Sequence, residues 1–269
     1  MKLSAMKDWF GRPAHPPVAP PAVRSVARAH LGLVRSVNED RLLERPDRGL
    51  WAVADGMGGH EGGDIAATTA VRALERTANR PGRIGIGDVE QALNTANLHI
   101  FEHFGRKGSS GSTVAGLMIG DDVATVFWIG DSRVYRYRGD RLELLTHDHS
   151  LVQDLVDAKV LTPDQARRHP NAHVITRALG AGETMRLDVK SLPLMAGDRF
   201  LLCTDGLWGM ISDTAIAALI PGDEAEAAAH LTSAALDAGG RDNLALILVD
   251  VGERDAREAY RVRPSPSSR

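Results

Sequence analysis

Short apolar runs that mostly follow one another in pairs constrain the fold of this chain more than any other feature. They are rich in Val, Ile, Leu and aromatic residues, a composition typical of β-strands. The runs cover residues 50–54, 113–119, 123–129, 134–137, 200–203 and 244–249. Strands that follow one another without an intervening helix favour antiparallel sheets over a doubly wound parallel sheet. The pattern therefore predicts antiparallel sheets with helices packed outside them.

Two longer segments, residues 63–79 and 88–104, are predicted helices. In the second, five apolar residues recur at helical spacing and form one face. They are Val89, Leu93, Ala96, Ile100 and Phe104. Residues 138–141, with the sequence Arg-Gly-Asp-Arg, predict a hairpin turn between two strands. The predicted fold class is α+β.

The 269 residues divide into one domain and two flanking segments. Five prolines among residues 12–22 make residues 1–22 a predicted leader or linker, although a ligand of a proline-binding module has the same composition. The tail, residues 253–269, ends in a Pro/Ser/Arg-rich stretch and is expected to be disordered. Residues 23–252 are the predicted domain.

Charge and cysteine content narrow the function classes and the compartment. The net charge of −3 gives no basic excess for nucleic acid or an anionic membrane. The one cysteine, Cys203, lies in an apolar run, so we expect a buried thiol and a reducing compartment. No stretch approaches the roughly 18 apolar residues of a membrane span, and residues 1–11 lack the apolar core of a signal peptide. We expect a cytoplasmic protein and a monomer.

Acidic residues stand repeatedly at the ends of the predicted strands. Asp55, Asp131 and Asp205 each follow an apolar run, Asp242 precedes the last run, and Glu39-Asp40 precede a further short one. If these strand ends converge, the carboxylates would destabilise one another unless a cation neutralises them. Oxygen ligands without nearby cysteine select Mg²⁺ or Mn²⁺ rather than zinc. Two such ions held by a shared carboxylate activate a water for displacement at phosphorus.

Two neighbouring features are compatible with such a site, and each has a simpler explanation. The glycines after Asp55 and Asp205 allow a tight turn and let a backbone carbonyl approach a metal, although Asp-Gly pairs also mark ordinary turns. Arg35, four residues before Glu39, could bind a phosphate dianion with two hydrogen bonds. Taken alone, it is a surface arginine.

Six motifs together resemble the type-2C metal-dependent Ser/Thr protein phosphatases in their bacterial form. They occur in the family's order between about residues 25 and 250. The motifs are RSVNED at 35–40, VADGMGGH at 53–60, GST at 111–113, GDSR at 130–133, TDGL at 204–207 and Asp242-Asn243.

The resemblance implies a four-layer α/β/β/α sandwich that hydrolyses phosphoserine and phosphothreonine in proteins. It implies that a water is activated between two Mn²⁺ or Mg²⁺ ions, and that a third ion binds more weakly. By matching position, Asp55 would bridge the two ions and the Gly56 carbonyl would bind one. Asp205 and Asp242 would complete the first ion's protein ligands, Glu39 and Asp40 would hold the second, and Asp131 the third. Arg35 would bind the substrate phosphate, and residues 147–176 resemble a mobile flap beside the cleft.

The family pattern is broken at one position, which leaves the general acid open. Some members carry a histidine directly after the Asp-Gly, where this chain has Met57. The proton for the leaving alkoxide would then come from His60 or from a metal-bound water. A positioned acid is worth about 10²–10⁴ in rate. For Asp131, pairing with Arg133 is the alternative to metal binding.

Several competing interpretations remain. His99, Glu102 and His103 fit the H-x-x-E-H zinc pattern, but we expect these histidines to be exposed. His147 and His149 are expected at the surface or in the flap. A non-catalytic phosphoprotein-binding module would be expected to lack a metal carboxylate, and a nuclease would need a basic groove. A small-molecule phosphatase would share the metal chemistry. The expected partners are phosphorylated proteins, including a Ser/Thr kinase and its targets.

Overall fold

The computed structural model describes residues 22–58, 62–104, 110–120 and 122–253. The predicted leader lies outside the described residues except for residue 22, and the tail except for residue 253. His60 also lies outside them. None of the described helices is long and apolar enough to cross a bilayer.

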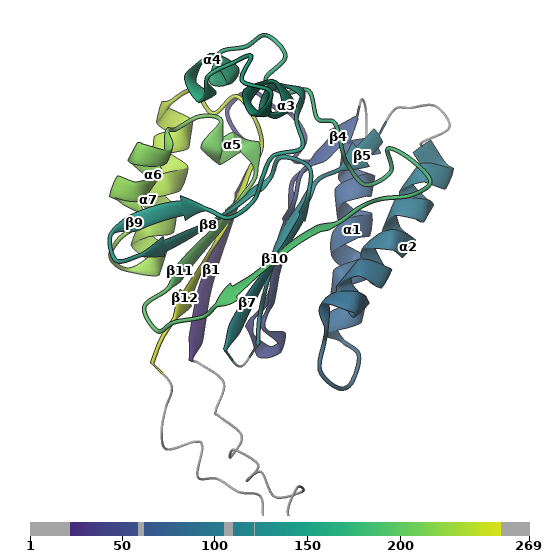
Figure 1. Cartoon of the computed structure of the whole chain (residues 1–269), viewed down its shortest axis with the longest axis horizontal. Coiled ribbons are helices and arrows are strands. Elements are labelled where there is room, and N and C mark those ends of the chain that lie inside the picture. The colour runs from purple at the N-terminus through teal and green to yellow at the C-terminus, as the bar shows by residue number, and fades with distance from the viewer. Residues whose placement is uncertain (1–21, 59–61, 105–109, 121, 254–269) are drawn as a thin grey trace, which may run out of the picture.

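Two five-stranded sheets face each other in the centre of the molecule (Figure 1). The first has the order β1 (Val23–His30), β12 (Leu244–Val251), β11 (Arg199–Cys203), β8 (Arg133–Arg138) and β9 (Arg141–Leu144). The second has the order β10 (Asp188–Pro193), β7 (Val123–Ile129), β6 (Val114–Ile119), β3 (Leu50–Ala54) and β2 (Arg41–Arg45). Neighbours in both sheets pair antiparallel. A small ladder, β4 (Gly56–Gly58) with β5 (Ser110–Ser112), continues beyond the second sheet.

Helices cover both outer faces and one end of this sandwich (Figure 1). The second sheet is covered by α1 (Gly62–Ala78) and α2 (Ile86–Phe104), and the first by α5 (Asp205–Trp208), α6 (Asp213–Leu219) and α7 (Glu224–Asp237). Two short helices, α3 (Leu151–Asp157) and α4 (Pro163–Arg167), lie at the end of the sandwich drawn at the top. The 3-10 helix Pro46–Arg48 joins β2 to β3. The predicted α/β/β/α sandwich is confirmed.

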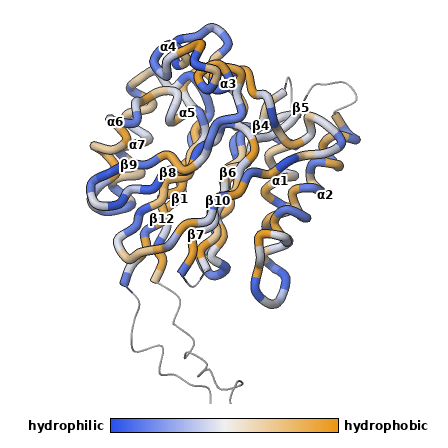
Figure 2. The backbone as a smooth tube through the Cα atoms, viewed as in Figure 1, coloured by the Kyte–Doolittle hydropathy of each residue, from blue (hydrophilic) through white to orange (hydrophobic). Residues whose placement is uncertain are grey.

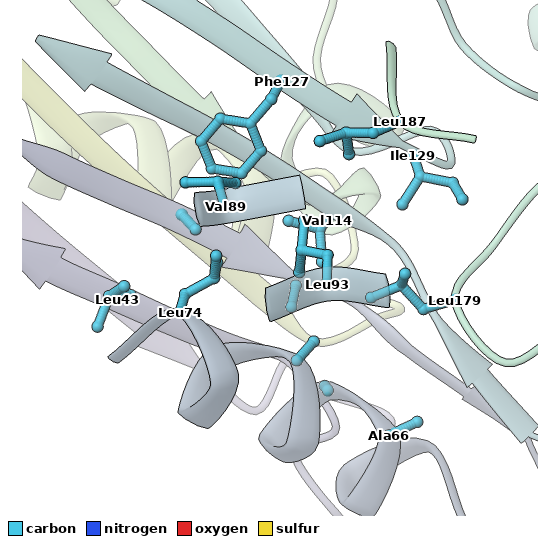
Figure 3. Packing of buried hydrophobic residues seen from close by; sticks show 14 of the residues in the cluster. Leu43, Ala66, Leu74, Val89, Leu93, Val114, Phe127, Ile129, Leu179 and Leu187 are labelled. Atoms are coloured by element: carbon cyan, nitrogen blue, oxygen red, sulfur yellow. The ribbon is translucent and has the colours of Figure 1, made fainter. Parts of the chain in front are cut away.

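Three apolar layers hold the four structural layers together, as the hydrophobic stretches along the strands in Figure 2 indicate. Strand β3 shows how: Trp51 and Val53 pack between the sheets, whereas Leu50 and Ala52 pack against the helices. All five residues of β3 are buried because both of its faces are covered. Figure 3 shows the layer between the second sheet and the helices α1 and α2, where Leu74 packs among strand and helix residues.

The six predicted strands, the hairpin and the first two helices are confirmed. The hairpin turn has positive φ at Gly139 (53°) and Asp140 (60°), as a type I′ turn requires. The prediction of only two helices was wrong, because seven α-helices occur in the described part of the chain. The short run after Glu39-Asp40 is β2. The additional strands β1 and β10 lie at sheet edges, where polar side chains replace the apolar run.

Candidate metal centre

A cavity of about 460 Å³ opens at the end of the sandwich where β3, β7 and β11 finish and β12 begins. Antiparallel pairing of β11 with β12 brings the end of one strand beside the start of the other. The lining residues are Arg35, Glu39, Asp55, Gly56, Met57, Gly58, Asp131, His173, Ile175, Asp205, Asp242 and Asn243. All the described residues of the predicted site except Asp40 therefore line one cavity.

Asp55 occupies the centre of the acidic cluster. Its backbone N–H donates to Thr113 Oγ1 at 3.0 Å, and its carbonyl accepts from the Thr113 N–H at 2.9 Å. Part of its surface faces the cavity, yet removal from bulk water raises the pKa of its carboxyl well above the usual range. The charges of Asp205, Asp40, Asp131 and Asp242 raise this pKa further. Protein groups alone therefore leave the charge of this carboxylate uncompensated.

Asp205 and Asp242 both line the cavity and repel each other. Burial and the Asp242 charge raise the pKa of Asp205 to about 6, although a hydrogen bond with the Asp55 side chain opposes the rise. Asp242 Oδ2 accepts a 2.7 Å hydrogen bond from Arg35 Nη2. Arg35 keeps 51% of its side chain exposed, so its guanidinium is accessible from the cavity.

Glu39 and Asp40 approach from the loop before β2. The Asp40 side chain is buried behind the cavity, where its Oδ2 accepts from Thr204 Oγ1 at 2.8 Å. Burial raises the pKa of Asp40 to about 8. The Glu39 carboxylate accepts the backbone N–H of Asp64 in the first turn of α1, where the helix dipole favours a negative charge. Burial still raises the pKa of Glu39.

The environment of the Asp131 carboxylate shows whether these residues fit a metal ion. Asp131 is 2% exposed, and its Oδ1 is buried without a hydrogen-bond partner. The alternative pairing with Arg133 does not form a contact, because Arg133 Nη2 lies 2.6 Å from Asp148 Oδ2 instead. An orphaned buried carboxylate oxygen beside other uncompensated carboxylates fits a hard cation.

The oxygen donors surround the cavity without closing around one point. Within the described ranges, no three His, Cys, Asp or Glu side chains form a ready-made metal-binding group. Such spacing suits Mg²⁺ or Mn²⁺, because Mg²⁺ in particular keeps several of its waters and takes few ligands from the protein. The donor set, all oxygen, is the one the sequence predicts.

The glycines after the aspartates are required by close packing rather than by a turn. A Cβ on Gly56 would lie 2.1 Å from the carbonyl oxygen of Gly63, and one on Gly206 would lie 1.8 Å from that of Asn243. Neither glycine has a positive φ. The interpretation of Gly56 and Gly206 as residues that allow a tight turn was therefore incomplete.

Sequence reasoning missed the residues that position the carboxylates. Asn243 Oδ1 accepts the Glu39 N–H at 2.8 Å, and Thr204 and Thr113 hold Asp40 and Asp55. Each of these polar residues belongs to one of the six motifs, which is the signal that could have identified it. His173, exposed on the loop after α4, also lines the cavity.

Four further histidines considered in the sequence analysis, His99, His103, His147 and His149, are not among the residues that line the cavity. His99 and His103 are exposed on α2, as expected, and His147 pairs with Asp157 at 2.7 Å on the surface. Of the two positions expected for His149, at the surface or in the flap, the surface position was wrong. His149 is 6% exposed, and its Nδ1 accepts the Gly130 N–H at 3.0 Å. Its burial lowers its pKa.

The buried position of Cys203 is confirmed. The thiol is 0% exposed in β11, and burial raises its pKa. A thiol kept protonated in this way is a poor nucleophile.

A four-layer sandwich with carboxylates gathered in a cavity at one end is the arrangement expected for the phosphatase family that the sequence resembles. The family model described as protein phosphatase 2C matches residues 34–237, and the chain belongs to this family of metal-dependent Ser/Thr protein phosphatases.

Curated relatives agree with this assignment. The chain is 35% identical over 238 residues to the serine/threonine protein phosphatase PstP of Mycobacterium tuberculosis, covering 87% of this chain and 46% of that protein. The chain thus spans about half the length of that relative. It is 34% identical over 247 residues to the protein phosphatase PhpP of Streptococcus pneumoniae, covering 84% of this chain and 96% of that one.

Solved structures show the same fold. The M. tuberculosis PstP structure aligns with a TM-score of 0.79 at 34% identity, covering 86% of this chain and 99% of that one. PppA, described as a key regulatory component of T6SS in Pseudomonas aeruginosa, aligns with a TM-score of 0.78 at 35% identity, covering 87% and 99%. A further structure of the PstP catalytic domain is in complex with two manganese ions.

Proposed function

We propose that this chain removes phosphate from phosphoserine and phosphothreonine in proteins, in a reaction that depends on Mn²⁺ or Mg²⁺. The observation that supports this most is the convergence of Asp55, Asp131, Asp205 and Asp242 with Arg35 in one cavity. Four carboxylates beside one accessible guanidinium suit two cations and a phosphate dianion.

The carboxylates divide into three groups of ligands. Asp55 would be shared between two ions, and the Gly56 carbonyl, Asp205 and Asp242 would complete the protein ligands of one of them. Glu39 and Asp40 would hold the second ion, in part through water, and Asp131 would help to hold a third and weaker one. When bound, the ions lower the pKa of a water and neutralise charge that develops on the phosphoryl oxygens.

Arg35 binds the substrate phosphate. In the structure its guanidinium is paired with Asp242 at 2.7 Å, and neighbouring cations would weaken that attraction. The guanidinium would then be available for a bidentate interaction with phosphate. The proton for the leaving alkoxide comes from water or from His60. His173 is a further imidazole at the cavity.

The proposal includes the cellular location, the oligomeric state and the partners of the protein. We place the protein in the cytoplasm, because its one cysteine is buried as a free thiol, and we expect it to act as a monomer. Its partners would be phosphoproteins, including a Ser/Thr kinase and its targets. The complete set of cavity carboxylates disfavours a non-catalytic binding module.

Metal removal is the direct test of the proposed activity. A phosphothreonine peptide should be hydrolysed by the protein with Mn²⁺ or Mg²⁺ and not after treatment with a chelator, because hard oxygen ligands supply the site. Phosphate release measured before chelation, after it and after Mn²⁺ is restored checks this expectation. Restoration of activity by Zn²⁺ alone would contradict it. A protein that hydrolyses an aryl phosphate but no phosphopeptide would instead be a small-molecule phosphatase.

Arg35→Ala should lower kcat/KM for the peptide by roughly 10- to 150-fold, the value of one charged hydrogen-bonding group. Inorganic phosphate should also inhibit this variant less strongly. The matched control is Arg24→Ala, which removes another surface arginine paired with a carboxylate, at 3.4 Å from Glu224. Equal phosphate inhibition and equal kcat/KM in the Arg35 variant and the wild type would make Arg35 a surface residue only.

A further inference from the structure

The loop between β1 and β2 exposes an unusual number of apolar side chains. Within residues 31–37, which we call the apolar loop, the exposed fractions are 38% for Leu31, 65% for Leu33, 68% for Val34 and 53% for Val37. Single exposed apolar residues are common on protein surfaces. Four such side chains occur within these seven positions, which makes the apolar loop a candidate interaction site.

The apolar loop is held in place by the residues beside the metal centre. The Asn243 side-chain amide donates to the carbonyls of Leu31 at 2.8 Å and Val37 at 3.0 Å, and so fixes both ends. The Leu33 N–H donates to the Gly240 carbonyl at 2.7 Å. Gly32 has a φ of +82°, and a Cβ there would lie 2.2 Å from the Asp242 carbonyl oxygen. The apolar side chains are therefore exposed in a loop whose backbone is fixed by hydrogen bonds and close packing.

The position of this loop relates it to the phosphate site. Arg35 lies within the loop and lines the cavity, directly after Val34. Ile175 also belongs to the lining of the cavity, and the adjacent Val174 is 37% exposed. A peptide whose phosphate contacts Arg35 would place its neighbouring residues beside these aliphatic side chains.

From this continuity we infer that the apolar loop is a specificity surface for phosphopeptides with aliphatic residues next to the phosphorylated one. The inference rests on the proposed phosphatase function and adds the substrate class. Removing about 50 Å² of apolar surface from water on contact corresponds to a preference of about five- to tenfold in kcat/KM. Val34 and Val37 are specificity-determining residues and take no part in the chemistry.

The test compares two phosphothreonine peptides of equal length and charge at saturating Mn²⁺. One carries Leu and Val beside the phosphothreonine, and the other carries Ser and Asn. Wild type should prefer the first by about five- to tenfold, and Val34→Ser and Val37→Ser should each reduce that preference. An aryl phosphate has no flanking residues, so the ratio of peptide to aryl-phosphate kcat/KM separates specificity from chemistry. The matched control is Val123→Ser, which changes a valine of 44% exposure at the opposite end of β7.

The outcomes distinguish this inference from the proposed function. The inference is overturned if the two peptides are hydrolysed at equal rates, or if the variants lower kcat/KM for all substrates alike. Either result leaves the phosphatase function intact. A protein that hydrolyses the aryl phosphate but neither of the two peptides would contradict the proposed function itself. If sedimentation shows that Val34→Ser converts a dimer to a monomer, the apolar loop is an interface between copies of this chain and the inference fails.

Discussion

Asp205→Asn should lower the hydrolysis of a phosphothreonine peptide by about a thousandfold or more, because bound metal ions contribute several kcal/mol to stabilising the transition state. Asp205 lies in the cavity between Asp55, with which it shares a hydrogen bond, and Asp242, whose charge raises its pKa. Asparagine preserves the shape of the side chain and removes the charge. Turnover at saturating Mn²⁺ measures the effect.

The same variant should retain the fold. In the metal-free protein, its melting temperature should equal or exceed that of wild type, because a charge that Asp242 repels has been removed. The matched control is Asp140→Asn, which changes an exposed aspartate in the β8–β9 turn at a left-handed position that asparagine tolerates. Wild-type turnover in Asp205→Asn would remove this residue from the metal site.

Asp148→Ala should lower the free energy of unfolding by about 3–5 kcal/mol, because it leaves a buried guanidinium without its carboxylate. Arg133 donates to both oxygens of Asp148, and the two side chains are only 11% and 5% exposed. The guanidinium also lies 3.8 Å from the centre of the Trp208 ring. Denaturant unfolding monitored by circular dichroism measures the loss.

A second arginine on β8 provides the control for this prediction. Arg136 pairs with Glu143, whose side chain is 46% exposed, so Glu143→Ala should cost less than about 1 kcal/mol. Replacing both buried partners, as in Arg133→Met with Asp148→Leu, should recover part of the stability lost in Asp148→Ala. A loss in Asp148→Ala no larger than in Glu143→Ala would show that the buried pair contributes little.

The central strands could be predicted because burial on both faces makes their sequences continuously apolar. In β12, Leu244 and Leu246 pack against the helices while Ala245 and Ile247 pack between the sheets. The edge strand β1 carries arginine and serine and has no such run. Strand pairing across more than 200 residues, as between Val23 and Val251, is also invisible to local patterns.

The carboxylates of the site could be predicted from local sequence, whereas the hydrogen bonds that hold them in place could not. Carboxylates at strand ends meet because antiparallel strands alternate in direction, so an aspartate after β11 faces one before β12. Asn243 links residues more than 200 positions away in the chain, at Leu31 and Glu39. Nothing local to Asn243 predicts those partners. His149 was misplaced for the same reason, since Gly130 and Asp188 lie in distant segments.

Titration of Mn²⁺ into the metal-free protein, followed by calorimetry, tests the metal centre most directly because it does not depend on turnover. The assignment of Asp55, Asp205 and Asp242 to one centre predicts two tightly bound ions in wild type, the number present in the PstP complex. It also predicts that Asp205→Asn loses at least one of them while Asp140→Asn keeps both. Wild type that binds no Mn²⁺, or an Asp205→Asn variant that binds it like wild type, would contradict the assignment.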